Sequence, residues 1–379
     1  MKSIKRFAWG VALATLLLPV AVSAETAVKI LPKQKVDVVF VLDTTGSMGG
    51  LIDGAKRKIW SIANTIVDDN PDAEIRVGLV GYRDIGDEYV TRSFELTTDI
   101  QGIYGKLLAF QADGGGDTPE SVNEALDAAV TKQGWAVPQS GQQVSKIIFL
   151  VGDAPPHMDY KQDRKYPEVI KEARQKGIIV NAVQAGGMRE TRKVWQEIAK
   201  LGAGEYIPIP QDGGRIVIIE TPYDDEIIVI QKELNGTVIP YGAAERQSAV
   251  RGKMESYEKA PKSSAADMAK YVNKSGKGKE VVTGAGDLIA DIDNGSRKLS
   301  DVKAAELPAN MQKMTDEEKT AYVTEMTKKR DDLAQKLAEK VSQRDEFIKT
   351  EEMKKGAEAA APADSFDRAV SKTLKEQLK

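Results

Sequence analysis

The sequence contains no cysteine and only one histidine, His157. Without cysteine the chain can form no disulfide and carry no lipid on a cysteine. An exported form would therefore depend on burial of a hydrophobic core for its stability. These two scarcities also disfavour a dedicated zinc or copper site, because such ions prefer nitrogen and sulfur ligands.

An excess of either charge is also missing. The chain has 54 Lys and Arg against 57 Asp and Glu, a formal net charge of -3. A nucleic-acid-binding surface needs a concentrated basic face, so no nucleic-acid partner is predicted. Beyond residue 24 no apolar run reaches the roughly 20 residues of a membrane-spanning helix. We expect no transmembrane span in the mature chain, and association with the cell envelope stays open.

The first 24 residues have the pattern of a cleavable signal peptide. Lys2, Lys5 and Arg6 precede an apolar run over residues 7–22, and small residues follow up to Ala24. A basic segment, an apolar segment and a small-residue cleavage site are typical of secretory leaders. Cleavage after Ala24 would give an exported bacterial protein, periplasmic or secreted. An uncleaved membrane anchor is the alternative.

Residues 33–220 alternate between strand-like and helix-like segments. Apolar and β-branched runs predict strands at 36–42, 75–82, 89–96, 146–151, 178–183 and 205–209. Helical spacing of apolar residues predicts helices at 51–67, 100–110, 119–132, 168–175 and 191–201. This alternation predicts a Rossmann-like α/β domain, with a mostly parallel central sheet flanked by helices.

The composition then changes, and residues 223–355 predict a mainly α-helical region. Residues 315–318 form a capping-box pattern, which should start a long helix. The apolar stripe of this helix is interrupted at Arg330 and Arg344, which favours a helical hairpin or small bundle over an extended coiled coil. Residues 356–379 predict an Ala/Pro-rich linker and a terminal amphipathic helix.

Three segments place oxygen-bearing side chains after a predicted strand or before a predicted helix. They are Asp43-Thr44-Thr45-Gly46-Ser47-Met48, Gly114-Gly115-Gly116-Asp117-Thr118-Pro119-Glu120 and Gly152-Asp153-Ala154-Pro155-Pro156-His157. Ligands of open α/β sheets gather at the carboxyl ends of strands, so we expect Asp43 and Asp153 to face one crevice. Carboxylates and hydroxyls are hard oxygen ligands, suited to Mg²⁺ or a similar ion.

These segments resemble the metal-ion-dependent adhesion site of the von Willebrand factor type A family. Residues 43–47 are similar to its Asp-x-Ser-x-Ser motif, with Thr45 replacing the first Ser. Thr118 and Asp153 fall where the family has its later Thr and Asp. The resemblance implies that Thr45 and Ser47 ligate the ion directly. It implies that Thr118 does so directly or through water, and that Asp43 and Asp153 act mostly through water.

The resemblance also implies the ion and the kind of partner. Mg²⁺ is the expected ion, with Mn²⁺ or Ca²⁺ as alternatives. The expected partner is a protein whose acidic side chain completes the metal shell. At each position a purely structural role is the alternative to metal ligation. Asp43 and Ser47 could cap the next helix, and residues 114–116 could form a turn. His157, on the same rim, is either a base for a metal-bound water or a solvated loop residue.

The leading functional prediction is a non-enzymatic, divalent-metal-dependent protein-binding module. The alternative is a Mg²⁺-dependent haloacid-dehalogenase-like phosphohydrolase, because residues 43–47 also resemble its phospho-accepting motif around a nucleophilic Asp43. Against this, Thr45 stands where such a phosphatase needs a second acid, and Asp153 and Asp159 are too far apart in sequence for its metal motif. In a third hypothesis the α/β domain is a scaffold and the helical region binds the partner.

Overall fold

The computed structural model describes residues 34–215, 218–276, 279–356 and 365–378. The predicted signal peptide and its cleavage site lie outside the described residues, as does most of the predicted Ala/Pro-rich linker. Within the described ranges, no helix is both long enough and apolar enough to cross a bilayer.

Six strands form a single sheet in the order β3-β2-β1-β4-β5-β6. β3 pairs antiparallel with β2, and the other neighbours are parallel. The predicted Rossmann-like α/β fold is thereby confirmed. The strands are β1 (Lys35–Asp43), β2 (Glu74–Tyr82), β3 (Thr91–Thr97), β4 (Val144–Gly152), β5 (Ile178–Ala185) and β6 (Ala203–Ile209).

β1 lies in the interior of the sheet because its side chains are apolar on both faces. Val36, Val38 and Phe40 pack into the core on one face. Val39 and Val41 pack into the core on the opposite face. A nearly continuous apolar run has this pattern in a parallel sheet that is covered on both sides.

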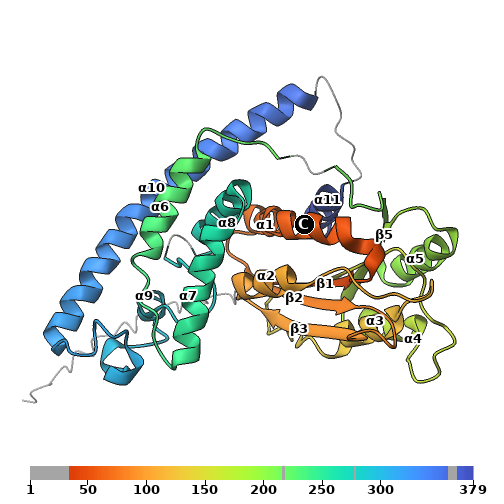
Figure 1. Cartoon of the computed structure of the whole chain (residues 1–379), viewed down its shortest axis with the longest axis horizontal. Coiled ribbons are helices and arrows are strands. Elements are labelled where there is room, and N and C mark those ends of the chain that lie inside the picture. The colour runs from red at the N-terminus through yellow and green to blue at the C-terminus, as the bar shows by residue number, and fades with distance from the viewer. Residues whose placement is uncertain (1–33, 216–217, 277–278, 357–364, 379) are drawn as a thin grey trace, which may run out of the picture.

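Helices cover both faces of the sheet (Figure 1). On one face lie α1 (Gly49–Asp69), α2 (Ile100–Ala109), α8 (Lys262–Ser275) and α11 (Phe366–Gln377). On the other face lie α3 (Val122–Thr131), α4 (Tyr166–Gln175) and α5 (Arg189–Leu201). The two layers bury the sheet, so its strand ends are the places where loops can form a site.

The start of α3 differs from the predicted helix at 119–132. α3 begins at Val122, three residues later. The backbone of Glu120 pairs instead with Pro156 in a parallel bridge. Pairing with a distant segment therefore holds residues 119–121 outside the helix.

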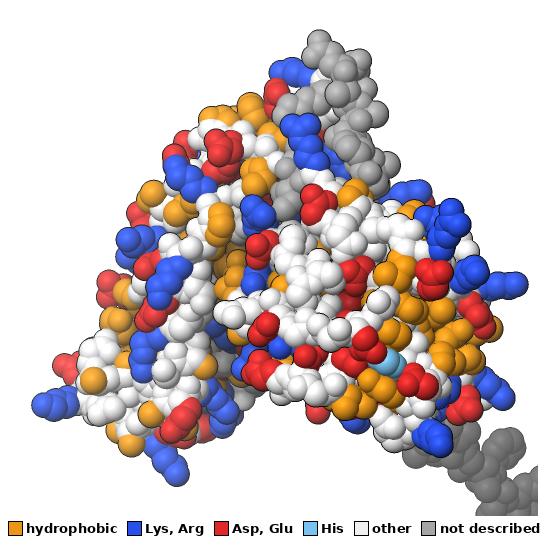
Figure 2. Space-filling view, turned by 45° about the vertical axis from the view of Figure 1, so that its right-hand side comes forward, with side chains coloured by type: hydrophobic (Ala, Val, Ile, Leu, Met, Phe, Trp, Pro, Cys, Tyr) orange, Lys and Arg blue, Asp and Glu red, His pale blue; other side chains and the backbone are white. Residues whose placement is uncertain are grey.

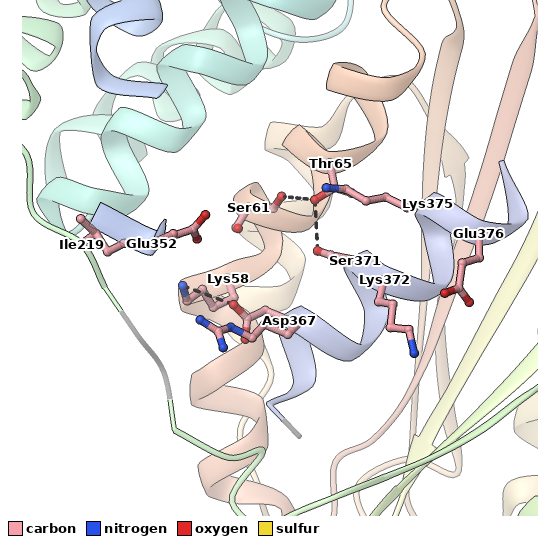
Figure 3. A pocket seen from close by; sticks show the side chains of 11 residues that line it. Lys58, Ser61, Thr65, Ile219, Glu352, Asp367, Ser371, Lys372, Lys375 and Glu376 are labelled. Carbon is pink, nitrogen blue, oxygen red and sulfur yellow. Dashed lines mark hydrogen bonds and ion pairs between the residues drawn. The ribbon is translucent and has the colours of Figure 1, made fainter. Parts of the chain in front are cut away.

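The last helix of the chain, α11, packs beside α1 on the sheet. The ring centroids of Phe366 and Phe40 lie 6.5 Å apart. Ser371 of α11 faces Thr65 of α1, whose Oγ1 donates to the serine Oγ at 3.1 Å (Figure 3). Val370 and Leu374 of α11 are fully buried. The C-terminal helix is thus part of the core of the α/β domain.

The remaining helices form a bundle to one side of the sheet (Figure 1). They are α6 (Asp224–Asn235), α7 (Ala244–Lys259), α9 (Leu288–Asp293) and the long α10 (Asp316–Gly356). The predicted capping box is confirmed at the start of α10. Thr315 N donates to Glu318 Oε2 at 2.8 Å, and Glu318 N donates to Thr315 Oγ1 at 3.2 Å.

The two arginines that interrupt the apolar stripe of α10 form buried ion pairs. Arg330 is 1% exposed and lies 2.7 Å from Asp287. Arg344 lies 2.8 Å from both Asp224 and Asp267. A buried charge left without its partner typically costs about 3–5 kcal/mol. These pairs therefore determine how α10 lies against α6, α8 and the segment before α9.

We expect Leu374→Ala to lower the free energy of unfolding by about 2–5 kcal/mol, because it opens a cavity between α11 and the sheet. Urea denaturation followed by circular dichroism measures this loss. Lys375→Ala, at an exposed position of the same helix, is the matched control and should change little. Equal stability of the two variants would show that α11 does not contribute to the core.

Candidate metal centre

The carboxyl ends of β1, β2 and β4 lie together at one edge of the sheet. The parallel register places Asp43 beside Tyr82 of β2, and Leu42 beside Val151 of β4. Residues 44–48 follow β1, and Asp153 follows the last residue of β4. Segments that are far apart in sequence therefore begin at the same level of the sheet.

Backbone hydrogen bonds join the three oxygen-rich segments. Gly46 N of the first segment donates to Gly114 O of the second (3.2 Å), and Asp113 N, just before the second segment, donates to Thr44 O (3.1 Å). The second and third are joined by Glu120 N to Pro155 O (2.9 Å) and by His157 N to Glu120 O (3.0 Å). The three segments thus converge at one edge of the sheet, as predicted for Asp43 and Asp153 from their positions after strands.

Asp43 begins the first segment and is fully buried. Its Oδ1 accepts hydrogen bonds from Thr45 N (2.9 Å) and Thr45 Oγ1 (2.6 Å). Thr45 Oγ1 also lies 3.4 Å from Ser47 Oγ, and Ser47 is exposed. These contacts form a row of oxygens that leads from a buried carboxylate to solvent.

Asp153 lies close to this row, whereas Thr118 does not contact it. The charge of Asp153 is near enough to raise the pKa of Asp43. Gln211, which follows β6, donates from Nε2 to Asp153 Oδ2 at 2.6 Å and to Ser47 O at 3.4 Å. Thr118 is exposed, and among the described residues no hydrogen bond links it to the other four predicted ligands.

Glu120 is a further acidic residue of this edge, which the sequence analysis placed in the second oxygen-rich segment but not among the predicted metal ligands. Its side chain is buried, and an added Cβ at Gly115 would lie 3.3 Å from both Glu120 Oε1 and Thr45 Cβ. Burial, together with the charges of Asp43 and Asp84, raises the pKa of Glu120 to about 9. No local pattern in the sequence indicates this burial, because it arises from the bridge to Pro156.

The electrostatics of the edge favour a bound cation. Burial, with a smaller contribution from Asp153, raises the pKa of Asp43 to about 7. Within the described residues, Asp43 Oδ2 and Glu120 Oε2 have no hydrogen-bond partner. Buried carboxylate oxygens without partners are costly, and a divalent cation would compensate their charge. Carboxylates and hydroxyls also match the oxygen preference of Mg²⁺ and Mn²⁺, so these residues fit such an ion.

Arg83, at the end of β2, holds the first and second segments in place. It is 3% exposed, and its Nε donates to Thr44 O at 3.2 Å. A second nitrogen of the same guanidinium donates to Gln111 O at 2.8 Å. Its guanidinium also lies 4.7 Å from the ring centre of Tyr89, whose hydroxyl is 2.7 Å from Thr44 Oγ1. These contacts stabilise the loops before any ion binds.

His157 is buried, not solvated as expected for a loop histidine. Its side chain is about 6% exposed and lies near Asp84, Asp117 and Asp159. Its ring stacks on Tyr160 with centroids 3.9 Å apart. Figure 2 shows Asp and Glu side chains gathered beside the one histidine of the chain. The face around the predicted metal site is therefore strongly acidic.

A separate surface cavity of about 500 Å³ lies between α1, α11 and the C-terminal part of α10 (Figure 3). Its charged lining is mixed, with four basic side chains and three acidic ones: Lys58, Arg368, Lys372, Lys375, Glu352, Asp367 and Glu376. The lining includes none of the predicted metal ligands. Because basic and acidic side chains are present in similar number, the cavity indicates no particular ligand.

A sequence model of the family described as von Willebrand factor A domain matches residues 37–220. Among curated proteins, an ariadne-like RING finger protein of Acanthamoeba polyphaga mimivirus is 30% identical over 126 residues. That alignment covers 32% of this chain and 11% of the relative. This chain thus spans about a tenth of the length of that relative.

Two solved structures show a more distant similarity. The conserved hypothetical protein BatB from Bacteroides thetaiotaomicron is 17% identical, with a TM-score of 0.35, over 60% of this chain and 100% of that one. The SpRpn10 VWA domain is 13% identical, also with a TM-score of 0.35, over 48% of this chain and 89% of that one.

We expect Gly152→Ala to damage the edge, because the new Cβ would collide with the Tyr82 hydroxyl and lie 3.2 Å from Asp43 Oδ2. Overpacking of this kind costs about 1–3 kcal/mol of unfolding free energy. Urea denaturation measures the loss. Gly105→Ala, which has open space around the added methyl group, is the control and should be neutral or slightly stabilising. A Gly152→Ala protein as stable as the control would contradict the tight packing around Asp43.

Proposed function

Because residues 37–220 form a von Willebrand factor A domain, we propose that this chain is a divalent-metal-dependent protein-binding module. Such domains generally act in protein interactions, often with a metal ion. The observation that carries the proposal is the buried Asp43 carboxylate, whose Oδ2 has no partner within the described residues. It lies beside two hydroxyls and a second carboxylate, as a cation site requires.

In this proposal the hydroxyls of Thr45 and Ser47 hold the ion directly, and Asp43 and Asp153 supply most of the negative charge. Thr118 joins by a local movement of its exposed segment or through water. When bound, Mg²⁺ or Mn²⁺ supplies positive charge that attracts a carboxylate. Because few charged side chains ligate it directly, the ion retains enough charge to bind an acidic side chain of a partner protein.

The loops around the edge offer apolar contacts to the same partner. Ile85, Met158 and Met188 are respectively 49%, 49% and 37% exposed. They follow β2, β4 and β5, so all three stand at the carboxyl edge of the sheet. We therefore propose a partner segment in which an acidic residue is flanked by apolar side chains. Such exposed hydrophobic groups commonly mark protein-interaction sites.

The geometry disfavours the phosphohydrolase alternative. A nucleophilic aspartate must reach the phosphorus of its substrate, and Asp43 is fully buried beside Tyr82 and Gly152. Thr45 occupies the position where such an enzyme needs its acid, and its hydroxyl is bonded to Asp43. We propose that the chain is not an enzyme.

We expect chelation to remove the ion and partner binding together, and Mg²⁺ or Mn²⁺ to restore both. Asp43→Ala and Ser47→Ala should each weaken Mn²⁺ binding by at least about 100-fold, since changes even in groups that only support ligands cost about 10- to 100-fold. Electron paramagnetic resonance of Mn²⁺ measures this. Ser47 is exposed, so its replacement should leave the fold intact.

The matched control is Glu255→Gln, which removes an exposed carboxylate of α7. It should bind Mn²⁺ as the unaltered protein does. Capture of partner proteins from an envelope extract is then compared with and without chelator. Capture that persists unchanged in chelator and in Asp43→Ala would eliminate the metal-dependent mechanism.

We also propose export to the periplasm or beyond the cell, on the strength of the N-terminal leader pattern. Protein purified from bacteria that carry a secretory system should begin at Glu25, as intact mass and N-terminal sequencing would show. Ala24→Arg should leave the leader attached, because small residues are needed at the cleavage position. Retention of residues 1–24 in the unaltered exported protein would favour an uncleaved anchor.

A further inference from the structure

A second group of possible metal ligands lies at the same edge of the sheet. Asp84 follows β2, Asp117 lies in the second oxygen-rich segment and His157 ends the third. One ligand atom from each lies within 4.8 Å of the others. The predicted metal ligands Asp43, Thr45, Ser47 and Asp153 are not part of this group.

The His157 ring presents an unpartnered nitrogen to the two carboxylates. The residue is 5% exposed, and its Nε2 has no hydrogen-bond partner within the described residues. Nε2 lies 3.4 Å from Asp84 Oδ2 and 3.7 Å from Asp117 Oδ1. These separations match ligands that share an ion, because two atoms at about 2.1 Å from a tetrahedral ion lie about 3.4 Å apart.

A carboxylate on the other side of the ring prepares His157 for ligation. Its Nδ1 lies 2.9 Å from Asp159 Oδ1. When a neutral ring keeps its proton on Nδ1 and donates a hydrogen bond from it to a carboxylate, the free lone pair is on Nε2, the arrangement of most metal-bound histidines. Tyr160 stacks on the ring at 3.9 Å and restricts its rotation.

Asp84 is held by neighbouring hydroxyls in the same way. Ser121 Oγ donates to Asp84 Oδ1 at 2.9 Å, and Tyr160 Oη donates to Asp84 Oδ2 at 2.9 Å. Each carboxylate oxygen keeps a lone pair for an ion. Asp117 is 63% exposed at its side chain, so an ion can enter from solvent on that side.

We propose that Asp84, Asp117 and His157 bind a divalent transition-metal ion such as Zn²⁺, separately from the Mg²⁺ site. Imidazole nitrogen favours late transition metals, whereas an all-oxygen set suits Mg²⁺. The sequence argument against a zinc site assumed that histidine and cysteine would supply most of the ligands. Here two carboxylates take that place, and the remaining positions are open to water or a partner atom.

The second ion would also affect the first site. Asp117 is adjacent to Thr118, so an ion held by Asp117 restrains the segment that carries the predicted Thr118 ligand. This consequence rests on the proposed function, whereas the transition-metal site does not. The experiment below tests the site without measuring partner binding.

Because His157 is the one histidine of the chain, selective ¹⁵N-histidine labelling of tag-free, full-length protein gives the signals of a single ring. We expect one equivalent of Zn²⁺, added in excess Mg²⁺ after chelator treatment, to shift the Nε2 resonance as ligation does. Nδ1 should remain protonated. If both ring nitrogens are protonated and Zn²⁺ does not shift their resonances, His157 forms an ordinary ion pair and the proposal is overturned.

Calorimetric titration with ZnCl₂ then assigns the other ligands. His157→Gln and Asp117→Asn should each weaken Zn²⁺ binding by at least about 10- to 100-fold. Asp117 is exposed, so its variant tests the site even if the buried histidine variant misfolds. Glu255→Gln is the control and should bind as the unaltered protein does.

Asp43→Ala separates the two sites. It should lose Mn²⁺ binding at the first site and keep the Zn²⁺-induced shift of His157. Loss of that shift in Asp43→Ala would mean that Zn²⁺ occupies the Mg²⁺ site instead, which also overturns the proposal. If the proposed function fails but the histidine still ligates Zn²⁺, the second site stands without it.

Discussion

The parallel alignment of β1 with β2 and β4 brings negative charge together at one edge of the sheet. Asp43 and Glu120 are buried there, and each has a carboxylate oxygen without a hydrogen-bond partner among the described residues. Keeping such groups ionised in the protein interior is unfavourable unless a positive charge compensates them. The loops, the buried Arg83 and the hydrogen bonds between segments all hold these carboxylates in place, which supports the cation site that we propose at this edge.

Two kinds of ion chemistry can arise from this single edge because its loops carry different donors. The loop after β1 offers hydroxyl and carboxylate oxygens, a hard set that suits Mg²⁺. The groups around His157 add an imidazole nitrogen, which changes the preferred ion. The hydrogen bonds between Glu120 and the third segment connect the two places. Exposed apolar side chains on the loops after β2, β4 and β5 add apolar surface to the same charged edge.

Much of the α/β fold could be predicted because it depends on local patterns. The apolar run of β1 and the helical spacing of α1 indicate their structures directly. The positions of Asp43 and Asp153 after strands also place them at one edge. The burial of Glu120 and His157 could not be predicted, because it comes from pairing between distant segments. The ion pairs of the α10 arginines could not be predicted either. Arg330 and Asp287 are 43 positions apart, and such a pairing produces no periodic pattern in the sequence.

The order of elements gives the helical bundle an unusual attachment. The chain leaves the sheet after β6, forms the bundle and returns to place α11 against α1. The bundle is therefore tethered to the α/β domain at both of its ends, like an insertion rather than a tail. A single backbone break within it would leave both fragments bound to the same core. Because α8 also packs on α1 partway along this segment, the bundle cannot swing freely as an arm held at one end would.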